Sequence, residues 1–254
     1  MLPSQLRGFA SKMSSKAAPT FRQAVLRKEI SPQKFRNFLI LDFEATCDTS
    51  PMSPLQEIIE FPIVRVNSET FDMEDRFHQY VLPNERPQLT AFCTKLTGII
   101  QDMVDGQPKF TETMQLLEQW LKDQHLICPD DSSKSHINWT FVTCGDWDIG
   151  TLLKRQAAYH NYDIPWYFKN WINLKVAYSE AMGYYPRSMK VMLNDLNITH
   201  QGRHHSGIDD VINMCSIIKA IAETGYVFRT TAALADEANG ASTVKPPKFG
   251  AKLY

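Results

Sequence analysis

The chain has 254 residues, with 27 Lys and Arg against 28 Asp and Glu, and 43% of its residues are hydrophobic. This length suits one or two domains and can bury a core without disulfides or structural metals, while the apolar share excludes wholesale disorder. No apolar run approaches the roughly 20 residues of a membrane span, and a formal net charge of −1 lacks the basic excess typical of proteins that hold nucleic acid by bulk electrostatics.

Both ends of the chain are predicted to lie outside the folded domain. Residues 1–33 carry Lys and Arg among Ser and Ala, and Glu29 is the first acidic residue. Such a segment is typical of a disordered basic leader or of a mitochondrial transit peptide, and both interpretations stay open. Residues 230–254 become rich in Ala and Thr and then in Pro and Lys, which predicts a flexible C-terminal tail. The folded domain is therefore expected over residues 34–229.

The first elements of that domain are predicted strands. Residues 37–42 form a short, strongly apolar run that fits a buried central strand. Residues 57–66 and 71–82 have the character of two further strands, joined by a polar turn at residues 67–69.

Helical spacing follows. Apolar residues recur at helical intervals over residues 110–121, a polar loop is expected at 130–135, and residues 139–144 predict another strand. A helix should begin near Ile149, and three more are expected over residues 171–182, 188–196 and 208–224. Strands first, and then strand alternating with helix, predict an α/β fold with a mixed β-sheet flanked by helices.

The five cysteines are odd in number, irregularly spaced and lack a Cys-x-x-Cys pair. This pattern argues against a disulfide framework or a zinc ribbon and favours a reducing, intracellular compartment. Cytoplasm and nucleus are the expected locations, and the basic leader leaves the mitochondrion open.

Two acidic residues, Asp42 and Glu44, follow the first predicted strand. Because side chains two residues apart in a strand share a face, both carboxylates should point the same way. Carboxylates held this close repel each other unless a cation lies between them, and oxygen ligands suit Mg²⁺ or Mn²⁺. Asp-x-Glu is common by chance, but its place after so apolar a strand favours a functional pair over a solvated strand end.

A second acidic position opens the helix near Ile149. Asp148 lies four residues before Leu152, on the helix stripe expected to face the sheet, whereas Asp146 precedes the helix. Asp148 is therefore the better candidate for a site at the strand ends. A simple helix cap remains a competing interpretation, because Asp is a good N-cap.

Residues 202–210 contain two His-x-x-x-x-Asp pairs, His204 with Asp209 and His205 with Asp210. Asp210 is the first residue on the apolar face of the last helix, whereas Asp209 is the first residue on its more polar face. A carboxylate on an apolar stripe is costly to bury unless a metal compensates for it. Asp210 is thus the predicted ligand and His205 its partner, while His204 and Asp209 are expected to be solvated or to cap the helix.

Together these segments offer four carboxylates and a histidine to one edge of a sheet. This is the equipment for two-metal hydrolysis of a phosphodiester, in which the ions activate water and stabilise the developing charge. An imidazole with a pKa near neutrality can remove the proton from the water.

Six segments then carry a family resemblance, in the same order along the chain: residues 38–48, 56–62, 96–99, 141–148, 171–175 and 202–210. They resemble the Eri family of 3′-to-5′ exoribonucleases, within the DEDDh exonuclease superfamily, and most of all its third, prion-protein-interactor-like branch. The resemblance covers roughly residues 35–230. It implies a ribonuclease H-like fold, hydrolysis from a free 3′ hydroxyl, release of 5′-monophosphates and Mg²⁺ or Mn²⁺ as cofactor.

The family's catalytic motifs match this chain at Asp42, Glu44, Asp148, His205 and Asp210. The four acids match metal ligands and the histidine matches the general base. Candidate substrate contacts are Leu96, Thr97, Gly98, Ile99, Trp147 and Arg203, although Gly98 could instead simply end a helix. His204 departs from the pattern, because close relatives often carry Pro there.

The leading interpretation is a 3′-to-5′ exoribonuclease acting on the 3′ ends of structured or small RNAs, with RNA as partner, further protein partners open and no membrane. One alternative is a DNA-preferring or sugar-indifferent exonuclease, since the same metal chemistry serves both polymers. Another is an adaptor that keeps the nuclease fold and acts mainly through protein partners.

Overall fold

The computed structural model describes residues 30–49, 56–128 and 138–235. Within these residues seven strands form one mixed sheet, in the order β2-β3-β1-β5-β6-β7 with β4 added beside β3. The predicted loop at 130–135 lies outside the described residues. The strands are β1 (Asn37–Leu41), β2 (Glu44–Ala45), β3 (Ile58–Asn67), β4 (Met73–Tyr80), β5 (Trp139–Thr143), β6 (Asn170–Asn173) and β7 (Ala232–Ala233).

Strand β1 lies inside the sheet, antiparallel to β3 and parallel to β5. Its side chains alternate between two cores: Phe38 and Ile40 face one, and Leu39 and Leu41 face the other. All four are fully buried. A central strand covered on both faces needs apolar side chains throughout, which explains the uninterrupted run in the sequence.

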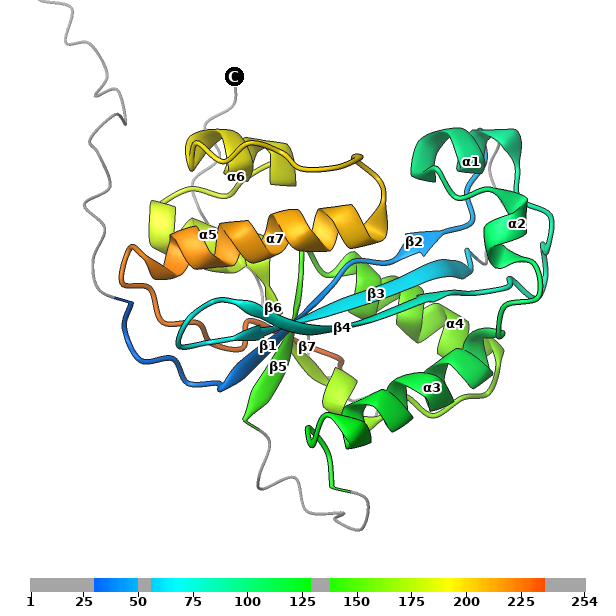
Figure 1. Cartoon of the computed structure of the whole chain (residues 1–254), viewed down its shortest axis with the longest axis horizontal. Coiled ribbons are helices and arrows are strands. Elements are labelled where there is room, and N and C mark those ends of the chain that lie inside the picture. Colours follow the sequence, from blue (N-terminus) through cyan, green and yellow to red (C-terminus); the bar gives the residue numbers. More distant parts are fainter. Residues whose placement is uncertain (1–29, 50–55, 129–137, 236–254) are drawn as a thin grey trace, which may run out of the picture.

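Helices cover both faces of the sheet (Figure 1). Helices α5, α6 and α7 pack over the core that contains Phe38, and α3 and α4 lie on the opposite face, while α1 and α2 lie beyond β2. The helices are α1 (Ala91–Thr97), α2 (Gln101–Val104), α3 (Phe110–Asp123), α4 (Lys154–Tyr159), α5 (Leu174–Met182), α6 (Met189–Asp195) and α7 (Gly207–Ala222), with a π-helix at Asp148–Leu153 and a 3₁₀ turn at Trp166–Phe168.

Helix α7 begins against the end of β1. A Cβ on Gly207 would lie 2.8 Å from the backbone oxygen of Asp42 and 3.0 Å from Pro62 Cγ. Only a glycine permits this approach, because real Cβ atoms do not come so close to a backbone oxygen. The apolar stripe of α7 then runs across the sheet, so its first turn is fixed at the strand ends.

The predicted α/β class is confirmed, but one element was wrong. The helix expected over 171–182 begins only at Leu174, because residues 170–173 form β6 and pair in parallel with β5. Asn173 marks the change, since its side chain accepts hydrogen bonds from the N–H groups of Lys175 and Val176. Pairing with a neighbouring strand overrides the local helical spacing of Trp171 and Ile172.

Both expected domain boundaries differ from the structure by a few residues. At the start, Ser31 donates to the carbonyl of Gly225 and Gln33 to that of Tyr226, so this part of the expected leader is attached to the domain. At the end, Ala232 and Ala233 form β7 against β6, within the expected tail. A two-residue strand of alanines carries no pattern that sequence analysis could detect.

Among the described residues, no helix combines the length and the apolar character needed to cross a membrane.

Candidate active site

Four carboxylates meet where β1 and β5 end. Asp42 directly follows β1, Glu44 opens β2, Asp148 is the first residue of the π-helix and Asp210 lies in the first turn of α7. Glu44, Asp148 and Asp210 are each at most 9% exposed, and Asp42 is half-buried. The carboxyl ends of parallel strands therefore collect acids from four separate elements.

Asp148 is tied directly to the connection between β1 and β2. Its Oδ1 accepts a hydrogen bond of 3.0 Å from the N–H of Phe43. Burial raises the pKa of Asp148 to about 6, and this hydrogen bond opposes the rise. The competing acid, Asp146, is exposed and accepts from the indole N–H of Trp171. The structure thus brings Asp148, and not Asp146, into the cluster.

The acids destabilise one another's charged forms. Desolvation raises the pKa of Asp42 well above its ordinary value, and the charges of Asp148, Asp210 and Glu44 raise it further. Desolvation likewise raises the pKa of Glu44 to about 9, with Glu60, Asp210 and Asp148 adding to it. A divalent cation would offset this repulsion, and a set of oxygen donors suits Mg²⁺ or Mn²⁺.

Asp210 connects the acids to the loop of residues 196–206 between α6 and α7, the histidine loop. Its Oδ2 accepts a hydrogen bond of 3.0 Å from the N–H of His205, while its buried Oδ1 has no hydrogen-bond partner in the described part of the chain. An orphaned buried acceptor calls for a partner such as an ion. Ligand atoms of Glu44, His205 and Asp210 all lie within 4.8 Å of one another, so the residues present fit a metal.

His205 lies at the open rim of the cluster. Its residue is exposed, and its backbone has a positive φ of 65°, which is uncommon for a residue with a side chain. Partial desolvation of the ring and the neighbouring His204 lower the pKa of His205 below its ordinary value. The neutral imidazole, the form that can accept a proton, is therefore favoured at neutral pH.

His204 and Asp209 have different surroundings from one another. Asp209 accepts from the N–H of Arg203 at 2.8 Å and stays outside the carboxylate cluster, as the phase argument predicts. The expectation of a solvated His204 was wrong, because its ring is half-buried and its Nδ1 lies 3.5 Å from Asp210 Oδ1. The loop turns this ring inward, which helical phase could not reveal for a residue before the helix.

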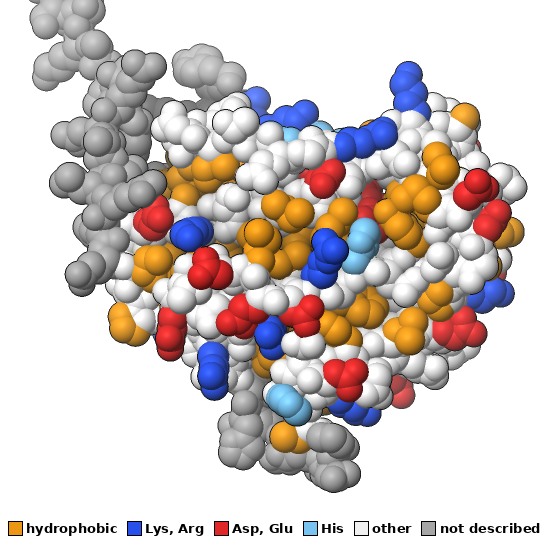
Figure 2. Space-filling model, viewed as in Figure 1, with side chains coloured by type: hydrophobic (Ala, Val, Ile, Leu, Met, Phe, Trp, Pro, Cys, Tyr) orange, Lys and Arg blue, Asp and Glu red, His pale blue; other side chains and the backbone are white. Residues whose placement is uncertain are grey.

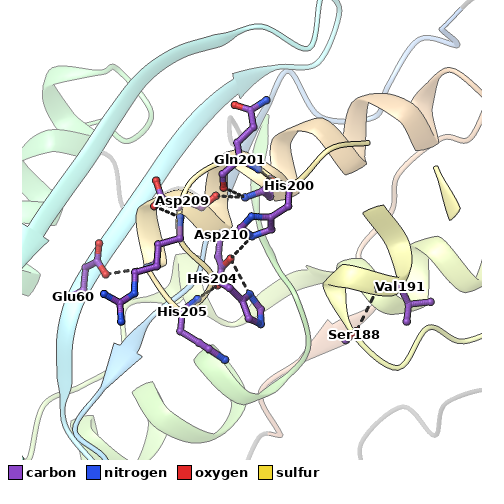
Figure 3. A network of polar contacts seen from close by, with 12 residues as sticks. Glu60, Ser188, Val191, His200, Gln201, His204, His205, Asp209 and Asp210 are labelled. Carbon is purple, nitrogen blue, oxygen red and sulfur yellow. Dashed lines mark hydrogen bonds and ion pairs between the residues drawn. The ribbon is translucent and has the colours of Figure 1, made fainter. Parts of the chain in front are cut away.

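Two residues near the site escaped the sequence analysis. Glu60, near the start of β3 and 1% exposed, accepts from the N–H groups of Gly207 and Ile208 at 2.9 and 3.2 Å, and His78 Nε2 lies 2.8 Å from it. The available signal was a single acid within a mostly apolar strand. His200, whose Nε2 lies 3.6 Å from Asp210 Oδ1 (Figure 3), offered no such signal because it precedes the motif at residues 202–210, in the same loop between α6 and α7.

The expected substrate residues are divided between exposed and internal positions. Arg203 was expected to face substrate, but its guanidinium donates to the carbonyls of Lys95 and Leu96 and packs on Gly98, where a Cβ would lie 2.5 Å from it. Gly98 ends α1 in the left-handed conformation, so the helix-ending interpretation is confirmed. Through its hydrogen bonds to Lys95 and Leu96, Arg203 links α1 to the histidine loop.

The side chains of Thr97 and Ile99 are buried, Leu96 is half-buried, and Trp147 is 42% exposed. Figure 2 shows the outline of the molecule notched between the side formed by α6 and α7 and the side formed by α1, with Lys and Arg side chains on both sides.

Known proteins resemble this chain in sequence and in fold. A family model described as "Exonuclease" matches residues 39–218. ERI1 exoribonuclease 3 of Homo sapiens is 48% identical over 201 residues, which cover 79% of this chain and 58% of that protein. The 3′-5′ exonuclease Snipper of Drosophila melanogaster is 35% identical over 213 residues, covering 80% and 75%.

A solved structure of the nuclease domain of 3′hExo, a DEDDh family member bound to rAMP, matches with a TM-score of 0.72 and 32% identity, over 79% of this chain and 98% of that one. The chain therefore belongs to the exonuclease family, with the ribonuclease H-like fold of its DEDDh members. Within that family it is of the Eri type. It spans 58% of the length of ERI1 exoribonuclease 3.

Proposed function

We propose that this protein is a 3′-to-5′ exoribonuclease that shortens RNA from its 3′ end by two-metal-ion hydrolysis and releases 5′-monophosphates. The observation that carries the proposal is the convergence of four largely buried carboxylates with His205 at their open rim. A purely structural cluster would place hydrogen-bond donors or cations against these acids. Here the neighbouring carboxylates instead raise the pKa values of Asp42 and Glu44.

The proposed ligands of the ions are Asp42, Glu44, Asp148 and Asp210, and Mg²⁺ or Mn²⁺ is the proposed identity. When bound, such ions supply an activated water and stabilise charge on the phosphoryl group and the leaving oxygen. The hydrogen bond from Phe43 N–H orients Asp148, and the hydrogen bond from His205 N–H orients Asp210. Both acids are thus held in place before any ligand binds.

His205 is the proposed general base. Its lowered pKa keeps the ring neutral near pH 7, and its exposed position gives it access to a water beside the substrate. General-base catalysis by a positioned side chain typically contributes about 10²–10⁴-fold. We therefore expect His205→Ala to lower kcat by that factor while the RNA affinity changes little.

RNA is the proposed substrate. One structural relative, with a TM-score of 0.73 and 31% identity, is described by its 3′-end-specific recognition of a histone mRNA stem-loop. In this chain Trp147 offers an exposed ring on which a base could stack. Leu96 and the backbone around Gly98 are further proposed contacts, whereas Thr97 and Ile99 contribute mainly by fixing the end of α1.

The 48% identity to ERI1 exoribonuclease 3 supports placement of this chain in the third branch of the Eri family.

A labelled RNA with a free or a blocked 3′ end tests the proposal in the presence of Mn²⁺. We expect stepwise shortening of the free end only, and no activity in Asp42→Asn or Asp148→Asn. Equal digestion of the blocked RNA would contradict an exonuclease, and activity that survives both substitutions would contradict the site.

Matched RNA and DNA strands competing in one reaction test the choice of sugar. We expect RNA to be consumed first, because discrimination requires only one protein contact to the 2′-OH. Preferential loss of the DNA strand would replace the proposal with a DNA-preferring exonuclease.

The location of the protein in the cell is a separate question. Imaging a tagged chain would distinguish cytoplasm, nucleus and mitochondrion.

A further inference from the structure

A second group of metal-binding side chains lies beside the carboxylates. His200 Nε2 and His204 Nδ1 lie 3.6 and 3.5 Å from the same atom, Asp210 Oδ1. Figure 3 shows both rings linked to this carboxylate, and both come from the single loop between α6 and α7. Both distances are too long for good hydrogen bonds.

All three atoms are buried and lack a hydrogen-bond partner in the described part of the chain. An unsatisfied buried polar atom destabilises the fold, so three of them rarely converge on one point without a shared partner. Asp210 itself is only 4% exposed, and its Oδ1 is aimed at the two rings. The arrangement therefore indicates a ligand held between the three side chains.

The spacing fits a tetrahedral metal ion. Zinc binds nitrogen and oxygen at about 2.0–2.2 Å, which places neighbouring ligand atoms roughly 3.4 Å apart in a tetrahedron. The two observed distances are 3.5 and 3.6 Å, and all three ligand atoms lie within 4.8 Å of one another. Two imidazoles with one carboxylate favour zinc over Mg²⁺, which prefers oxygen ligands in an octahedron.

The loop that carries both histidines is held in this shape. The Asn213 side chain donates to the carbonyl of Gln201 at 2.8 Å and accepts from its N–H at 2.9 Å. Asp209 accepts from the N–H of Arg203 on the same loop. Supporting hydrogen bonds of this kind orient metal ligands and are part of a built site.

We propose that His200, His204 and Asp210 form a zinc site that shares Asp210 with the carboxylate cluster and whose fourth position is open to water. It needs none of Asp42, Glu44 or Asp148. Because Asp210 Oδ1 would be withdrawn from the carboxylate cluster, zinc should inhibit the nuclease, and excess Mn²⁺ should relieve the inhibition. Only this inhibition rests on the proposed function; zinc binding does not.

Cobalt provides a readout that is independent of activity, because tetrahedral Co²⁺ absorbs visible light and can replace zinc. The titration uses the full chain with Asp42→Asn and Glu44→Gln, which disables the carboxylate site and leaves the three proposed ligands. We expect one equivalent of Co²⁺ to give a tetrahedral spectrum that Zn²⁺ removes and a large excess of Mg²⁺ does not.

Substitution of the histidines assigns the ligands. In that background, His200→Gln and His204→Gln should each weaken Zn²⁺ binding at least about tenfold, whereas His125→Asn, at an exposed turn outside the site, should not. Circular dichroism verifies that each variant is folded. Unchanged zinc affinity in both histidine variants would overturn the proposal, as would loss of binding on the Asp42→Asn/Glu44→Gln change alone.

Inhibition is measured separately on the unsubstituted enzyme. If the zinc site is present and zinc does not inhibit, the binding inference stands and the proposed catalytic use of Asp210 fails.

Discussion

At the scale of single residues, the carboxylates of the site work against folding when no cation is present. The folded-state pKa of Glu44 is raised from 4.5 to about 9 by burial and neighbouring acids. The unfolded chain therefore ionises this group at lower pH than the folded chain does. Its contribution to stability is fully present below about pH 4.5 and is lost as the pH rises toward about 9.

This predicts that removing a catalytic acid stabilises the metal-free protein. At pH 8 in EDTA, Glu44→Gln should raise the Tm by at least about 2 °C, given that 1 kcal/mol shifts Tm by about 2–4 °C at this size. Glu69→Gln, at an exposed turn, is the control and should leave Tm unchanged. Thermal melts with and without Mn²⁺ provide the test, and Mn²⁺ should raise the Tm of the unsubstituted chain more. A lower Tm for Glu44→Gln would contradict the electrostatic account.

Helical and strand phase were sufficient to choose among neighbouring acids. Phase favoured Asp148 over Asp146 and Asp210 over Asp209, and the structure buries the favoured member of each pair in one cluster. Phase could not place His200, because a loop residue has no period to follow. Glu60 was hidden for a different reason, since its role depends on a helix that starts 147 positions later in the chain.

At the scale of elements, the site depends on how closely α7 approaches β1. Gly207→Ala should push the helix away, because its Cβ would meet Asp42 O at 2.8 Å. Overpacking of this kind lowers the free energy of unfolding by about 1–3 kcal/mol. The resulting displacement of Asp210 should lower kcat at least about tenfold. Gly145→Ala is the matched control, since nothing lies within 4 Å of its added Cβ. Equal activity of the two variants would show that the approach is not critical.

Glu60 is the positioning residue for the same helix. Glu60→Ala should cost about 1–3 kcal/mol of stability, because two N–H groups of α7 lose their acceptor. It should also lower kcat with little change in the KM for RNA, since Glu60 holds Asp210 in place and makes no proposed substrate contact. Glu60→Gln keeps an acceptor and should restore part of kcat. A rise in KM alone, measured by steady-state kinetics, would contradict this role.

Element prediction failed where pairing between distant segments decides the structure. Residues 171–173 have helical spacing with the segment that follows, yet they extend the sheet because β5 offers a parallel partner. The short β7 exists only because it pairs with β6. Local pattern was reliable for β1 and α7, whose apolar character is set by burial along their own length.

At the scale of the whole molecule, a net charge of −1 has to be reconciled with a nucleic-acid substrate. Two divalent ions would add four positive charges and bring the balance from −1 to about +3. The remaining attraction is local, since Lys and Arg side chains flank the notch between α1 and α6–α7 in Figure 2. Such a charge distribution can bind the few phosphates nearest the 3′ end, and we expect few contacts beyond them.

The salt dependence of RNA binding measures this footprint. For single strands the slope of log K against log salt is about −0.7 for each phosphate neutralised, so three or four contacts should give a slope of about −2 to −3. Fluorescence anisotropy of a labelled RNA, with Ca²⁺ in place of the catalytic ion and salt varied from about 50 to 200 mM, gives the value. Lengthening the RNA at its 5′ end should leave the slope unchanged. A slope steeper than about −5, or one that grows with RNA length, would mean that an extended surface binds the RNA. The small net charge would then be a poor guide to the number of phosphates that the protein contacts.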